Sequence, residues 1–197
     1  MIIAVTGNAL GTAIMSQTGL GMTAWGSSSS NLAAYFNISL GTGFIVLSAF
    51  FYTIAVIIRK KIIIKEMIFS TVFLLSFGYL VNIFLLFIPD FRDLNIIVNF
   101  LINIVGLLIL LFAIAVHLKV NFAVHPMDVY LKTINEKFNS VIKGTYFSYI
   151  SAFLVAIVFG LLNGEIQNIG IGTFNTIAFS GIVLNFYYSK VITKWTF

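Results

Sequence analysis

Residues 94–118 read LNIIVNFLINIVGLLILLFAIAVHL, and this stretch decides the class of fold. It contains no Asp, Glu, Lys or Arg. A helix needs about 20 apolar residues to cross about 30 Å of hydrocarbon. The stretch therefore predicts a membrane-spanning helix. Asn95, Asn99 and Asn103 recur at a spacing of four, which places three amides on one face of that helix.

The rest of the chain has the same apolar character. Of its 197 residues, 60% are hydrophobic and only 9% are charged, whereas soluble domains average about 25% charged residues. The mean hydropathy is +1.07. We predict an all-α polytopic membrane protein with six transmembrane helices in a single membrane domain, residues 1–197. The six segments are Met1–Ser16, Leu40–Ile58, Met67–Ile88, Leu94–Leu118, Gly144–Leu162 and Asn168–Tyr188.

The net charge of +5 carries information on orientation. Ten of the 11 basic residues lie in 59–65, 119–143 and 190–194, and only Arg92 lies in a loop on the other side of the predicted membrane. Basic residues are enriched in cytoplasmic loops, so we expect both termini in the cytoplasm. The same distribution indicates membrane lipid as a partner rather than nucleic acid.

Residues from the first half recur 102 or 103 positions later. Phe36-Asn37 returns as Phe138-Asn139, Gly41-Thr42 as Gly144-Thr145, Ser70-Thr71 as Gly172-Thr173, and Gly78-x-x-x-Asn82 as Gly181-x-x-x-Asn185. Three crossings in each half force the second half to enter from the opposite side. The recurrence predicts two inverted three-helix repeats, residues 1–91 and 92–197. Such repeats are typical of secondary transporters, which bind their solute near the midplane.

A connecting segment follows the first helix of each repeat. Residues 17–39 carry no charge, which predicts a re-entrant or broken helix shielded by the bundle. The counterpart, 119–143, is more polar. Its Pro126 and Asp128 suit the start of a helix. We expect that helix to lie at the cytoplasmic interface, with an apolar face made by Val129, Tyr130, Ile134 and Phe138.

Three short motifs carry a resemblance to a known family. They are Gly19-Leu20-Gly21-Met22-Thr23-Ala24-Trp25, Pro126-Met127-Asp128 and Gly170-Ile171-Gly172-Thr173. The chain resembles the YczE/YitT-like family of bacterial integral membrane proteins, whose members carry Gly-Leu-Gly-x-x-Pro-Trp-Asp after the first helix. Here Ala24 and Gly26 stand where the family has Pro and Asp, which leaves Asp128 as the surviving carboxylate. The resemblance implies a bacterial plasma-membrane protein with no settled activity.

No charged residue lies in the middle of any apolar segment, so a solute would be held by neutral polar groups and helix dipoles. The candidate binding residues are Asn8, Thr12, Trp25, Ser27, Asn82, Asn99, Asn103, Asp128, Thr173 and Asn185. For most of them, interhelical hydrogen bonding is the competing interpretation. Trp25 suits an interfacial anchor or a lid over a cavity. The Gly-Thr pairs that open three helices suit either ordinary capping or anion binding.

These features favour a small transporter or permease for a neutral or anionic solute. The alternatives are a partner-dependent substrate-binding subunit of the energy-coupling transporter type, or a membrane scaffold or regulator, with a protein partner or a homo-oligomer. An enzyme is not expected, because Ser27 to Ser30 lacks a hydrolase motif and the chain has no cysteine. We expect no cofactor. His117 and His125 are interpreted as structural residues rather than metal ligands.

Overall fold

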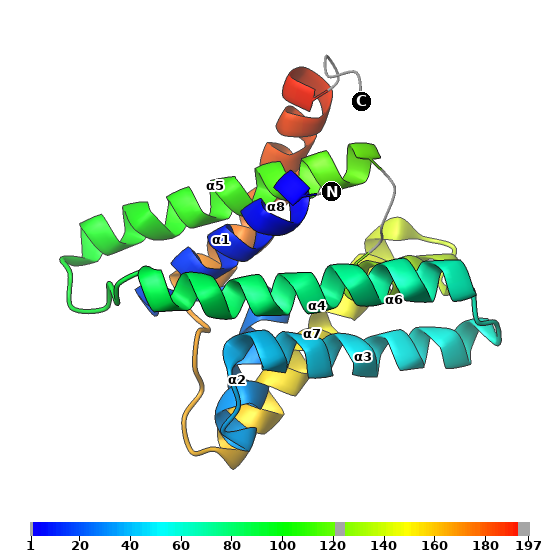
Figure 1. Ribbon diagram of the computed structural model, residues 1–197, viewed down its shortest axis with the longest axis horizontal. Coiled ribbons are helices and arrows are strands. Elements are labelled where there is room, and N and C mark those ends of the chain that lie inside the picture. Colours follow the sequence, from blue (N-terminus) through cyan, green and yellow to red (C-terminus); the bar gives the residue numbers. More distant parts are fainter. Residues whose placement is uncertain (1, 121–124, 193–197) are drawn as a thin grey trace.

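The structure is a computed structural model that describes residues 2–120 and 125–192 (Figure 1). The side chains at positions 117–120, 141, 142, 145, 181, 185, 188 and 189 lie outside this description. The described chain is all-helical. Its elements are α1 (Ile2–Thr18), α2 (Ala24–Phe36), α3 (Leu40–Arg59), α4 (Ile64–Phe87), α5 (Ile96–Val120), α6 (Pro126–Lys137), α7 (Val141–Leu162), α8 (Ile171–Phe186) and the π-helix η1 (Tyr187–Val191).

Each of the six predicted apolar segments coincides with a helix. Among the described residues, α3, α4 and the part Ile96–Val116 of α5 are long and apolar enough to cross a membrane, and Tyr146–Leu162 is a shorter apolar stretch. Large apolar side chains are strongly exposed, such as Leu86 at 82% and Leu161 at 67%. Apolar patches of this kind mark surfaces that water does not cover. The fold is therefore compatible with a membrane protein.

The two connecting segments each form a short helix. Helix α2 is buried continuously over residues 26–33, as expected for a segment packed against the bundle. Helix α6 buries Val129, Tyr130 and Ile134, in agreement with the predicted apolar face. The prediction for Phe138 is wrong, because α6 ends at Lys137 and the Phe138 side chain is 43% exposed.

The same kind of turn follows α2 and α6. Asn37 and Asn139 both adopt the left-handed conformation, with φ of 52° and 49°, which Asn tolerates better than most residues. A serine then caps the next helix. The Ser39 Oγ accepts a hydrogen bond from the Thr42 N–H at 3.2 Å, and the Ser140 Oγ accepts one from the Lys143 N–H at 3.3 Å. The chain thus uses one helix–turn–helix design twice.

Helices α1 and α5 run antiparallel and in contact (Figure 1). Their backbones meet at Gly11, where an added Cβ would lie 2.6 Å from the Gly106 carbonyl oxygen and 2.7 Å from the Leu110 nitrogen. Small residues at such crossings let helices approach closely in lipid. The C-terminal end of α1 is thereby placed beside the first turns of α5.

Candidate functional site

Two irregular segments meet where α1 ends. One connects α1 to α2, and the other connects α7 to α8. The Gly172 N–H donates to the Leu20 carbonyl oxygen at 2.8 Å, and the Met22 N–H donates to the Asn168 carbonyl oxygen at 3.0 Å. Gly21 has φ of +114°, and a Cβ there would lie 2.5 Å from the Thr173 Oγ1. Only glycine fits both this conformation and this close approach.

Two asparagines of α5 bind the first of these segments. The Asn99 Nδ2 donates to the Thr18 carbonyl oxygen at 2.8 Å. The Asn103 Nδ2 donates to the Thr18 Oγ1 at 2.8 Å and to the Gly21 carbonyl oxygen at 3.0 Å. Both asparagines are almost fully buried, at 3% and 0% exposed. Because these Nδ2 atoms point at hydrogen-bond acceptors, the nitrogen and oxygen of each amide group are assigned without ambiguity.

Helix α2 binds the second segment. The Ser27 Oγ donates to the Asn168 carbonyl oxygen at 2.6 Å, and the Asn168 Nδ2 donates to the Ser30 Oγ at 2.7 Å. Asn31 pairs with the backbone of Gln167 in both directions: its Nδ2 donates to the Gln167 carbonyl oxygen at 2.7 Å, and its Oδ1 accepts from the Gln167 N–H at 2.8 Å. These bonds join residues far apart in the chain and fix the α7–α8 connection to α2.

Helix α8 begins at the same place. The Thr173 Oγ1 accepts from the Gly170 N–H at 3.3 Å and donates weakly to the Asn168 carbonyl oxygen at 3.4 Å. We call the whole set the polar junction, and every member is buried and uncharged. Its members are Thr18, Gly21, Ser27, Ser30, Asn31, Asn99, Asn103, Asn168 and Thr173.

The polar junction contains hydrogen-bond acceptors that the protein leaves unused. Within the described residues, the Oδ1 atoms of Asn99, Asn103 and Asn168 are buried and accept no hydrogen bond. Leaving a buried polar atom unpaired costs about 1–3 kcal/mol, so such an atom in a native fold needs an explanation. The other unpaired buried oxygens belong to Ser48, Tyr52 and Asn135 on α3 and α6. The polar junction therefore contains three buried acceptors that the hydrogen bonds of the described residues leave unpaired.

The helix N-termini that begin with Gly-Thr pairs use their N–H groups internally. The Gly41 N–H donates to the Asn82 Oδ1 at 2.9 Å, and the Gly144 N–H donates to the Ser140 carbonyl oxygen at 3.0 Å. The Gly172 N–H is occupied by the Leu20 carbonyl oxygen. Bonds to other parts of the protein therefore occupy Gly41 and Gly172, whereas the prediction that Gly144-Thr145 opens a helix is wrong, because α7 begins at Val141 and Gly144 lies within its first turn. The geometry gives no support to an anion site at these positions.

The structure brings together only some of the predicted binding residues. Ser27, Asn99, Asn103 and Thr173 belong to the polar junction. Asn8 is half-buried and Thr12 is buried on α1. Three further candidates, Asn82, Trp25 and Asp128, lie in other parts of the fold. The side chain of the last candidate, Asn185, lies outside the described residues, and so does the side chain of His117.

Trp25 is half-buried and packs against two other rings. Its ring packs edge-on against Phe51 at a centroid distance of 4.9 Å and against Tyr130 at 6.1 Å. Asn82 holds α4 to the start of α3, and Asp128 is exposed on α6. Trp25 and Asn82 therefore have packing contacts that account for them.

Five residues of the polar junction were not among the predicted candidates: Thr18, Gly21, Ser30, Asn31 and Asn168. A signal for four of them was present in the sequence. Gly21, Ser30 and Asn31 lie in the uncharged segment 17–39, and Thr18 follows the predicted first helix. Asn168 is placed by a left-handed backbone with φ of 55° in a connection, which spacing rules do not reveal.

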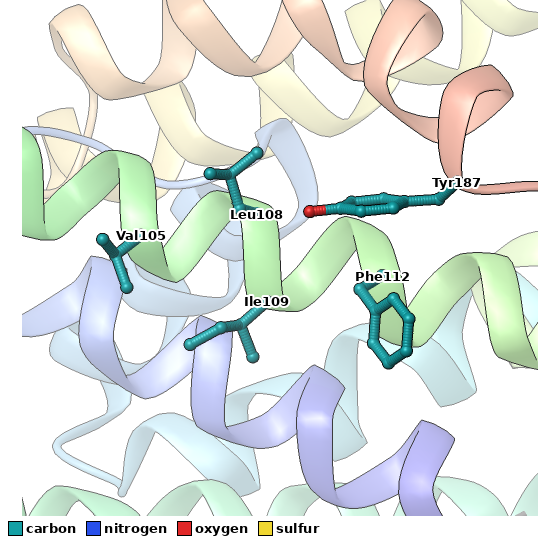
Figure 2. A pocket seen from close by; sticks show the side chains of 5 residues that line it. All are labelled: Val105, Leu108, Ile109, Phe112 and Tyr187. Carbon is teal, nitrogen blue, oxygen red and sulfur yellow. The ribbon is translucent and has the colours of Figure 1, made fainter. Parts of the chain in front are cut away.

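Two hollows lie on the surface of α5, and neither is lined by a residue of the polar junction. One, of about 270 Å³, is lined by Ile96, Ile97, Phe100 and Ile171. The other, of about 260 Å³, lies between α5 and η1. The Tyr187 ring extends over α5 with its hydroxyl toward Leu108, and Val105, Ile109 and Phe112 complete the lining (Figure 2). Their apolar linings suit hydrocarbon chains better than a polar solute.

Among the residues that the structure describes, no group of three or more His, Cys, Asp or Glu side chains could hold a metal ion. His125 instead caps α6, since its Nδ1 accepts the Met127 N–H at 3.2 Å. Its ring packs edge-on against Phe73 and Phe77 at centroid distances of 5.3 and 5.6 Å. His125 thus has a structural role in starting α6.

The α-helices and exposed apolar side chains define a class of all-helical proteins compatible with a membrane. The chain belongs to the family described as "Family of unknown function (DUF6198)", which matches residues 1–189. Comparison with curated proteins and with solved structures gave no match.

Proposed function

We propose that the protein is a small permease of the bacterial plasma membrane for a neutral solute that carries N–H or O–H donors. The observation that carries this proposal is the set of three unpaired amide oxygens, Asn99 Oδ1, Asn103 Oδ1 and Asn168 Oδ1. A solute that donates to them supplies hydrogen bonds that these oxygens lack within the protein. An anion is disfavoured, because the unpaired atoms carry partial negative charge.

The two inverted repeats form the second part of the proposal. Helix α2 of the first half packs on α7, and α6 of the second half packs on α3. The contacts correspond residue by residue. The Ser28 Oγ donates to the Ala152 carbonyl oxygen, and Tyr130 lies against Phe51 at a centroid distance of 4.7 Å. Tyr130 follows Ser28 by 102 positions, and Ala152 follows Phe51 by 101. This pairing of contacts supports a two-fold relation between the halves.

The same contacts change one pair in the predicted repeat. A Cβ on Gly43 would lie 2.9 Å from the Ala33 Cβ on α2, and a Cβ on Gly144 would lie 2.6 Å from the Asn135 Cα on α6. Since Asn135 follows Ala33 by 102 positions, these contacts support pairing Gly144 with Gly43 in the proposed repeat, in place of Gly41. The reason is the turn before α7, which is one residue shorter: Ser140 follows Asn139 directly, whereas Ile38 separates Asn37 from Ser39.

The membrane arrangement completes the proposal. We propose that α1, α3, α4, α5, α7 and α8 cross the bilayer, with both termini in the cytoplasm. The distribution of Lys and Arg supports that orientation. The motifs at 19–25, 126–128 and 170–173 support membership of the YczE/YitT-like group. The two apolar hollows on α5 support membrane lipid as a partner.

Flux through liposomes tests the permease directly. Purified protein in liposomes should accelerate the entry of urea or glycerol, measured by stopped-flow light scattering. Asn99→Ala should lower the protein-dependent rate about tenfold, the factor expected from losing one buried hydrogen-bonding group. Asn95→Ser is the matched control, because Asn95 is exposed directly before α5 and caps that helix, its Oδ1 accepting from the Ile97 N–H.

Two results would contradict the proposal. Equal flux in protein-containing and empty liposomes would remove the permease, and faster entry of lactate than of either neutral solute would overturn the preference for neutral molecules. Co-purification of an ATPase pair from native membranes, together with absent flux, would support the substrate-binding subunit. A stable partner that supports no uptake would instead favour the scaffold or regulator.

A further inference from the structure

A second tie between the halves lies at the far end of α3. Arg59 is the last residue of α3, and its Nη1 lies 3.1 Å from the Glu66 Oε1 in the first turn of α4. Its Nη2 donates to the Val129 carbonyl oxygen on α6 at 3.4 Å. The two charged side chains are only 16% and 23% exposed. The guanidinium therefore connects the α3–α4 hairpin of one half to a helix of the other half.

One residue of this tie, Val129, corresponds in the proposed repeat to Ser27 of the polar junction. Val129 follows Ser27 by 102 positions. Ser27 contacts the α7–α8 connection, and Val129 contacts the residue that precedes the α3–α4 connection. Ser27 and Val129, which correspond in the proposed repeat, thus each take part in a contact between the halves, but with different chemistry. One contact uses a network of neutral hydrogen bonds, and the other uses a guanidinium held by a carboxylate.

The packing beneath the two ties also differs. Rings contribute to both contacts: Tyr35 and Phe36 of α2 lie against Phe159 of α7 at centroid distances of 5.4 and 5.7 Å, and Phe51 of α3 lies against Tyr130 of α6 at 4.7 Å. The α2–α7 contact adds small groups, because the Ser28 hydroxyl donates to the Ala152 carbonyl oxygen and Gly160 lies close to Asn31. Small residues allow backbones to approach closely. At the α3–α6 contact, the Arg59 guanidinium donates to the Val129 carbonyl oxygen, so loss of that bond leaves ring packing between these two helices.

We propose that the Arg59–Glu66 pair is a latch that keeps α6 closed on α3, and that this interface is the one that opens toward the cytoplasm. Glu66 neutralises the guanidinium and aims it at the Val129 carbonyl oxygen. Without the carboxylate, the guanidinium turns to solvent or lipid phosphate and the bond to α6 is lost. The inference uses the repeat and the orientation of the proposed function, but it does not depend on which solute, if any, is transported.

The absence of cysteine from the chain allows a direct test in membranes. Thr133→Cys places a reporter on α6, where Thr133 is 2% exposed, and Ser28→Cys places a matched reporter at the α2–α7 contact, where Ser28 is fully buried. Each is combined with Glu66→Gln, and the labelling rate by N-ethylmaleimide is measured. We expect an increase of about tenfold for the reporter at 133 and no change at 28, because one charge-assisted contact controls only the first interface.

Two further variants separate a latch from general loosening. Glu66→Asp keeps the charge, so labelling at position 133 should stay within about twofold of the parent. Arg59→Lys should behave like Glu66→Gln, because an ammonium lacks the fork that reaches two acceptors. An unchanged rate at 133 in Glu66→Gln, or an equal rise at 133 and 28, overturns the proposal. Since no solute is involved, absent liposome flux would leave this result intact.

Discussion

Replacing Asn103 by Ala should lower the free energy of unfolding by about 2–4 kcal/mol, the range for losing a buried hydrogen-bonding side chain and leaving a cavity. The amide is fully buried and donates to both the Thr18 Oγ1 and the Gly21 carbonyl oxygen. Its loss strands the Gly21 carbonyl and frees the start of the α1–α2 connection. Unfolding by SDS in mixed micelles, followed by tryptophan fluorescence, measures the change.

Two other asparagines of α5 serve as internal controls for Asn103. Asn99→Ala should cost less, because the Asn99 Nδ2 makes a single bond to the Thr18 carbonyl oxygen. Asn95→Ser should change the unfolding free energy by less than about 0.5 kcal/mol, as is usual at exposed positions. Equal costs at positions 95 and 103 would show that the polar junction does not hold the fold.

The three asparagines also show how far sequence reasoning reaches. Their spacing of four predicted one polar face, and the structure divides that face in two. Asn95 precedes the first turn of α5 and caps it, whereas Asn99 and Asn103 lie where α1 ends and the connection turns inward. Periodicity gives the face of a helix, but the depth along its axis depends on where its neighbours begin and end. The positions of the helices were predictable because apolar length alone determines them.

The other half of the polar junction was out of reach for a different reason. Asn31 binds the backbone of Gln167, which lies 136 positions away in the chain. Asn168 binds the side chain of Ser30, which lies 138 positions away. Such contacts depend on the path of an irregular connection that contains the left-handed residue Asn168. No repeating pattern encodes that path. The lack of charge in segment 17–39 predicted packing against the bundle, which residues 26–33 show, but it could not identify the residues that this segment contacts.

Replacing Gly41 by Ala should destabilise the protein by about 1–3 kcal/mol, the usual cost of overpacking, although alanine favours a helix by about 1 kcal/mol over glycine. A Cβ at position 41 would overlap the carbonyl oxygen of Gly78, and it would lie 2.7 Å from the Asn82 Oδ1. The backbone of α4 cannot rotate away from the methyl group as a side chain could. The hairpin must therefore separate, which also breaks the bond from the Gly41 N–H to Asn82.

A graded series of glycine substitutions tests this reasoning against a general sensitivity of glycines. At Gly11 a Cβ would lie 2.6 Å from the Gly106 carbonyl oxygen. At Gly7, in the same α1–α5 crossing, a Cβ would contact Ala113 alone, at 3.0 Å from the Ala113 Cβ. The fall in melting temperature should therefore be largest for Gly41→Ala, intermediate for Gly11→Ala and smallest for Gly7→Ala, where helix propensity offsets most of the contact. If Gly7→Ala lowered the melting temperature most, the cost of these substitutions would not follow the contact distances. The close approach of α3 to α4 at Gly41 and Gly78 would then not explain the sensitivity of Gly41.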